Sequence, residues 1–130
     1  MQIRQTSQRF NFDKYPNLKQ NIDPKQRAWI EVKGKAIETN VRYLKTKLIK
    51  NCQFMAVVKA DGYGHDAKVV SDYAIKGGAS ELGVATLEEG IKLRSFGVKQ
   101  PILIRGNLYT KKDLIISFKN DLMPTISSMR

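Results

Sequence analysis

The fold is decided by the stretch Phe54-Met55-Ala56-Val57-Val58-Lys59-Ala60-Asp61-Gly62-Tyr63-Gly64-His65. A short apolar run ends there on a lone lysine, Lys59. A glycine-rich turn follows at once and carries Tyr63 and the chain's only histidine, His65. A cation at the end of a buried strand costs free energy unless something uses it. Lys59 is therefore the first candidate for chemistry.

Strand-like and helix-like segments alternate on the C-terminal side of this stretch. The strand starts at Phe54, Leu82, Pro101 and Met123 are 28, 19 and 22 residues apart, the cadence of consecutive βα units with a parallel sheet. The strands are apolar throughout, as strands covered on both faces are. An open doubly wound sheet and part of a (β/α)8 barrel both fit. A barrel needs about 250 residues, so about four βα units make half of one.

The element boundaries follow from periodicity and capping signals. The 3.6-residue apolar stripe predicts a helix over 35–50, and Gly77-Gly78 ends a second helix over 66–76. Thr86 with Glu89 is a capping-box signature, and Thr110 is the N-cap of a last helix that runs to about residue 118. The predicted strands are 28–32, 54–59, 82–85, 101–104 and 123–126. Residues 1–26 are predicted to be a flexible leader, and the domain spans 27–130.

Composition narrows the function classes. The 130 residues include one cysteine, Cys52, and one histidine, so we expect neither a disulfide framework nor a metal site. No apolar segment reaches the roughly 18–20 residues that span a bilayer, so we expect no membrane partner and a cytoplasmic protein. The net charge of +11 makes nucleic acid a candidate partner. Most of this charge lies away from the Lys59 stretch, because the net charge is +8 in residues 1–50 and +3 in residues 51–130. We therefore expect a solvated basic face and no nucleic-acid partner.

The chemistry of the Lys59 motif follows from its place in the sheet. Functional groups lie at the carboxyl ends of parallel strands, where Lys59 stands. Partial desolvation there favours the neutral amine that Schiff-base chemistry with an aldehyde requires. Tyr63 follows in a turn that can return its phenol to the same edge, where it can donate to a phosphate oxygen. Spacing alone leaves open the alternative that the Lys59 side chain only extends into solvent. His65 is expected to bond backbone groups.

The identities of the residues resolve this choice. The run Ala56-Val57-Val58-Lys59-Ala60-Asp61-Gly62-Tyr63-Gly64-His65 closely resembles the pyridoxal-phosphate attachment signature of alanine racemases. The resemblance extends from about Arg27 to Thr125. It includes Gly77-Gly78-Ala79 and the stretches 82–90 and 101–104.

This resemblance implies a specific fold and function. The fold would be α/β, the N-terminal part of a fold-type III pyridoxal-phosphate (β/α)8 barrel. Lys59 would be catalytic, holding the cofactor and serving as one of two bases that move the α-proton of alanine. Tyr63 would bind the cofactor phosphate. The product, D-alanine, would supply cell-wall peptidoglycan, and the full-length enzyme would be a homodimer. Another fold-type III protein, such as a broad-specificity racemase or a cofactor-homeostasis protein, is the alternative.

The sequence also departs from the family pattern. Asp66 stands where glycine is usual, and Arg105 stands where an aliphatic side chain is usual near the cofactor. The resemblance puts the second base and other cofactor contacts beyond these 130 residues. We therefore expect the chain to be an N-terminal fragment, with an open sheet edge, marginal stability and no turnover by itself.

Overall fold

The computed structural model describes residues 30–128, of which residues from Glu31 onward belong to one compact unit. The predicted leader over 1–26 and the domain boundary at 27 lie outside the described residues. Residues 30–32 form no strand, and residues 28 and 29 of the strand predicted there are also outside the described part. A strand needs a neighbour to pair with, and none of the described strands lies beside this segment.

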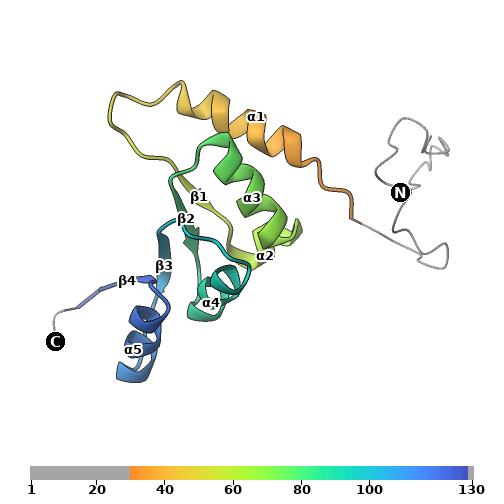
Figure 1. The fold of residues 1–130 in the computed structure, drawn as a ribbon. Coiled ribbons are helices and arrows are strands. Elements are labelled where there is room, and N and C mark those ends of the chain that lie inside the picture. The colour runs from red at the N-terminus through yellow and green to blue at the C-terminus, as the bar shows by residue number, and fades with distance from the viewer. Residues whose placement is uncertain (1–29, 129–130) are drawn as a thin grey trace, which may run out of the picture. The chain divides into compact units, whose positions relative to one another are not determined.

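A four-stranded parallel sheet organises the fold (Figure 1). Its strands lie side by side in chain order: β1 (Met55–Val57), β2 (Glu81–Val84), β3 (Ile102–Asn107) and β4 (Met123–Thr125). The helices between them are α2 (Lys59–Gly64), α3 (Ala67–Gly77), α4 (Leu87–Ser95) and α5 (Lys111–Lys119). This confirms the α/β class and the βα cadence predicted from the sequence.

The capping residues begin the helices as predicted. The Thr86 hydroxyl accepts the amide of Glu89, and the Glu89 carboxylate accepts the amide of Thr86, which completes a capping box. Thr110 accepts the amide of Asp113 at the start of α5. These bonds satisfy amides that the first turn of a helix leaves without partners.

The helix before β1 is shorter than predicted. α1 covers Gly34–Lys45 and stops five residues before the predicted end at Lys50. The Thr46 hydroxyl donates to the Tyr43 carbonyl, and Ile49 is 82% exposed. Because a continued helix would find no apolar surface to bury here, propagation beyond Lys45 gains little.

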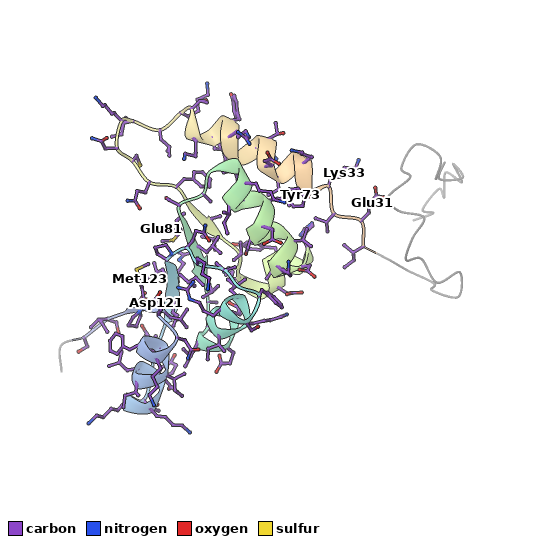
Figure 2. The ribbon with its side chains drawn as sticks, viewed as in Figure 1. Glu31, Lys33, Tyr73, Glu81, Asp121 and Met123 are labelled. Carbon is purple, nitrogen blue, oxygen red and sulfur yellow. The ribbon has the colours of Figure 1, made fainter. Side chains whose placement is uncertain are left out.

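The hydrophobic core lies on one face of the sheet. Fully buried residues pack against α3, α4 and α5: Leu82, Val84, Ile102 and Ile104 at alternate positions of β2 and β3, and Val58 directly after β1. The residues between them, Met55, Val57 and Leu103, are partly exposed and belong to neither core cluster. Figure 2 shows Glu81 and Met123 on the side of the sheet away from α3 and α4. Among residues 30–128, the helices therefore cover one face of a sheet whose strands are apolar on both.

α1 packs along α3 at very close range. The Tyr73 ring reaches from α3 to the start of α1, where it lies against Gly34 (Figure 2). At the other end, a Cβ on Gly77 would lie 2.7 Å from the Cβ of Val41 and 2.8 Å from the Glu38 carbonyl oxygen. Neither of these neighbours is the end of a flexible side chain. Gly77 therefore sets the distance between the helices, and Gly34 leaves room for the Tyr73 ring.

We expect Gly77→Ala to destabilise the chain by about 1–3 kcal/mol through overpacking, more than the roughly 1 kcal/mol that alanine gains in helix propensity. Urea unfolding followed by circular dichroism measures the change. The control is Thr39→Ala on the exposed side of α1, which should be neutral or slightly stabilising. Equal stability of wild type and Gly77→Ala would contradict the close approach of α1 and α3.

Candidate functional site

The segment after β1 is a turn of left-handed backbone. Five successive residues have positive φ, at 49° for Ala60, 53° for Asp61, 66° for Gly62, 55° for Tyr63 and 79° for Gly64. The Gly62 amide donates to the Val58 carbonyl at 3.0 Å, so the turn has helical bonding of the opposite hand. A left-handed conformation costs roughly 1–2 kcal/mol for each L-residue other than glycine. This turn therefore needs support from outside itself.

The turn brings Lys59 and Tyr63 together. The Lys59 ammonium nitrogen lies 5.9 Å from the centroid of the Tyr63 ring, at the range of a cation–π contact. Val58 is buried, and its amide donates to the Gly83 carbonyl at 2.8 Å, which fixes the chain one residue before Lys59. Tyr63 is 57% exposed. The sequence predicted both residues at the carboxyl edge of the sheet, and the structure places them there side by side.

Gly62 and His65 have structural roles in the turn. A Cβ on Gly62 would lie 2.9 Å from Cγ2 of Val70, so this position requires glycine for space as well as for backbone conformation. The Nδ1 atom of His65 lies 3.0 Å from the Tyr63 carbonyl oxygen and 3.3 Å from that of Gly62. His65 therefore bonds backbone groups, as predicted from the sequence.

Asp66, the first departure from the family pattern, has a backbone conformation that favours glycine. Its φ of 68° and ψ of 108° are strained for an L-residue. Its side chain compensates by capping α3, because Oδ1 accepts the amide of Val69 at 3.0 Å. An N-cap of this kind contributes about 1 kcal/mol. Aspartate thus replaces the conformational freedom of glycine with a helix cap.

Arg105, the second departure, lies on the partly exposed face of the sheet. A Cβ on Gly83 would lie 3.5 Å from Cδ of Arg105, so the arginine stem runs over this glycine. β3 has an irregularity between Ile104 and Asn107, and Gly106 approaches the Ala85 carbonyl so closely that no Cβ fits there. Arg105 is exposed, and within residues 30–128 no carboxylate forms an ion pair with it.

A hollow of about 310 Å³ opens at the carboxyl ends of β2 and β3. The residues that line it include Ala85, Thr86, Gly106, Asn107 and Tyr109. Lys59 and Tyr63 are not among its lining residues, so the hollow is a neighbour of the candidate site and does not enclose it.

Sequence reasoning missed the ion pair that ties the turn to α4. Asp61 Oδ1 accepts from the Lys92 ammonium at 3.1 Å and from the Ala67 amide at 3.3 Å. The Lys92 ammonium first, and the Ala67 amide second, hold the pKa of Asp61 below its ordinary value. Lys92 stands 31 residues from Asp61 in the chain, and no local pattern pairs residues at that distance.

Because the folded-state pKa of Asp61 is lowered, its contribution to stability is present above the unfolded-state pKa and is lost as pH falls through the folded-state value. We expect Lys92→Met to raise the folded-state pKa of Asp61, so that this pH-dependent contribution becomes smaller and its loss is complete at a higher pH. Carbon-detected NMR titration of the carboxyl group measures the shift. The control is Lys68→Met, which removes a separate exposed ion pair with Asp72 and should leave Asp61 unchanged. An unaltered Asp61 titration in Lys92→Met would contradict the assignment.

Comparisons with known proteins agree with this geometry. The family model "Alanine racemase, N-terminal domain" matches residues 32–130. The chain is 51% identical over 109 residues to an alanine racemase of Prochlorococcus marinus, covering 84% of this chain and 28% of that protein. An alanine racemase of Nostoc is 48% identical over 103 residues, covering 79% of this chain and 27% of the relative.

Solved structures show the same relationship. The alanine racemase of E. faecalis superimposes with a TM-score of 0.68 at 39% identity, over 72% of this chain and 25% of that one. The enzyme of Bacillus anthracis, solved with bound L-Ala-P, gives 0.68 at 35% identity, over 72% and 24%. The chain thus spans about a quarter of the length of these relatives, and its four strands match part of their barrel. By its sequence and its fold, the chain belongs to the alanine racemase family, within the N-terminal domain.

Proposed function

We propose that this chain supplies the cofactor lysine of a pyridoxal-phosphate-dependent alanine racemase, which interconverts L- and D-alanine and provides D-alanine for peptidoglycan. The observation that carries the proposal is the pairing of Lys59 and Tyr63 on one turn at the carboxyl edge of β1. The membership of this chain in the alanine racemase family supports the proposal. A homodimer in the cytoplasm is part of the same proposal.

The residues at this edge fit pyridoxal phosphate. Lys59 offers an amine to an aldehyde, and the partly exposed Tyr63 offers a phenol donor to a phosphate. Gly83 presents no side chain to the open face of the sheet, and the side chains of Met55, Val57 and Arg105 close over it. Arg105 adds a cation on the same face that pairs with no carboxylate of residues 30–128, and it is suited to an anionic ligand.

Lys59 has two successive tasks in this proposal. Its amine would hold the cofactor at the aldehyde carbon. The same amine, when free, would remove or return the α-proton of alanine on one face. Pyridoxal phosphate, when bound, supplies the electron sink that acidifies this carbon. Tyr63 would hold the cofactor phosphate in place by donating its phenolic hydrogen to a phosphate oxygen. A tyrosine of the partner subunit would serve as the second base.

Reductive trapping tests the lysine. With pyridoxal phosphate and borohydride, we expect a stable adduct on Lys59 well above that on Lys112, an exposed lysine in α5, by peptide mass spectrometry. Tyr63→Phe keeps the ring and removes the hydroxyl, so labelling by pyridoxal phosphate should fall about tenfold, while labelling by pyridoxal, which lacks the phosphate, should not change. Equal labelling of Lys59 and Lys112 would overturn the cofactor assignment.

A turnover assay tests the second part of the proposal. The matched family model is the N-terminal domain, and the resemblance puts the second base elsewhere. We expect the 130-residue chain with pyridoxal phosphate to give no L-to-D conversion above a Lys59→Ala control, as measured by chiral chromatography. Conversion that disappears in Lys59→Ala would show that one base and this part of the barrel suffice.

A further inference from the structure

We infer that Glu89 is a positioning residue for Lys59: its carboxylate fixes the left-handed turn to the ends of β1 and β2. The inference rests on the proposed role of Lys59 and extends it to a residue 30 positions away in the chain. Glu89 does not touch the reacting atoms. It acts through the backbone that carries Lys59 and Tyr63.

The Glu89 carboxylate binds three backbone amides from two separate segments. Oε1 accepts from Ala60 at 2.7 Å, directly after Lys59. Oε2 accepts from Ala85 at 2.8 Å and from Thr86 at 3.3 Å, directly after β2. Hydrogen bonds to an ionised acceptor are roughly twice as strong as neutral ones. One side chain thus connects the carboxyl ends of two neighbouring strands.

The Ala60 bond holds a backbone that is unfavourable by itself. Ala60 begins the left-handed run, and alanine has no side chain that could stabilise this conformation locally. A cavity of about 180 Å³ lies between the turn and α4, lined by Val58, Asp61, Ala67, Val84, Glu89, Lys92 and Leu93. Close packing therefore does not hold this side of the turn. Polar bonds from α4 cross the gap.

α4 presents two such groups on one face. Glu89 bonds Ala60, and Lys92, three residues later, bonds Asp61. Residues three apart on a helix point the same way, so both reach the turn from the same side. Glu89 contacts the residue next to Lys59, whereas Lys92 contacts the residue after that. The positioning of Lys59 is therefore assigned to Glu89 and not to Lys92.

The capping box provides a control that separates this role from ordinary helix capping. Thr86→Ala removes the hydroxyl half of the box, the bond to the Glu89 amide, but keeps the Glu89 carboxylate and its bond to Ala60. Glu89→Gln keeps the shape of the side chain but removes the charge that strengthens the Ala60 bond, and it leaves one oxygen to serve amides on two sides. Both variants weaken the start of α4, and only the second disturbs the turn.

The first readout needs no cofactor. Amide hydrogen exchange by NMR should show Ala60 exchanging about tenfold faster in Glu89→Gln than in wild type, with no such change in Thr86→Ala. Unchanged Ala60 protection in Glu89→Gln would overturn the inference, whatever Lys59 does. If Glu89→Gln does not fold, Glu89→Asp replaces it, because its shorter side chain keeps the charge and draws back from Ala60.

The second readout is the rate of borohydride-trapped labelling of Lys59 by pyridoxal phosphate, normalised to Lys112. It should fall about fivefold or more in Glu89→Gln and stay within about twofold of wild type in Thr86→Ala. Equal rates in the two variants, with Lys59 still labelled selectively in wild type, would overturn the positioning role alone. Absence of selective labelling in wild type would overturn the proposed cofactor site, and the exchange measurement would still decide whether Glu89 holds the turn.

Discussion

The left-handed backbone from Ala60 to Tyr63 is the constraint on which the candidate site depends. It reverses the chain directly after β1 and the buried Val58, so the ring of Tyr63 returns to the lysine that precedes the turn. A right-handed turn would carry the ring in another direction. Because three of the four residues are not glycine, the conformation persists only where the surrounding structure determines it. The strain is thus located within the candidate site, in the residues that directly follow Lys59.

Support for this turn comes from a helix that follows a different strand. Asp61 and Ala60 both bond side chains of α4, and Gly62 packs against α3. The site is therefore a property of two consecutive βα units rather than of the signature that identifies it. The exposed Arg105 comes from a third unit and lies over Gly83 on the same sheet. A change at position 105 therefore leaves the hydrogen bonds of α4 with the lysine turn in place.

Much of this fold could be predicted from residue patterns. Thr86 and Thr110 marked two helix starts because capping is local chemistry, and the apolar runs located all four described strands. The hand of the backbone at Ala60 could not be predicted, because alanine by itself favours the opposite hand. The contacts of Glu89 and Lys92 with the turn could not be predicted either. They join residues about 30 apart, and their geometry exists only once two strands are paired.

The chain order of the strands has a consequence for folding. Each strand in the sheet lies beside the one that precedes it in the sequence, so every new pairing closes a loop of one βα unit. Closure entropy rises slowly with loop length, and none of these steps must wait for a distant segment. The sheet can thus grow one strand at a time during synthesis, from the N-terminal side. All the residues that bond the lysine turn have been made once α4 is complete, while β3 and β4 are still to be added.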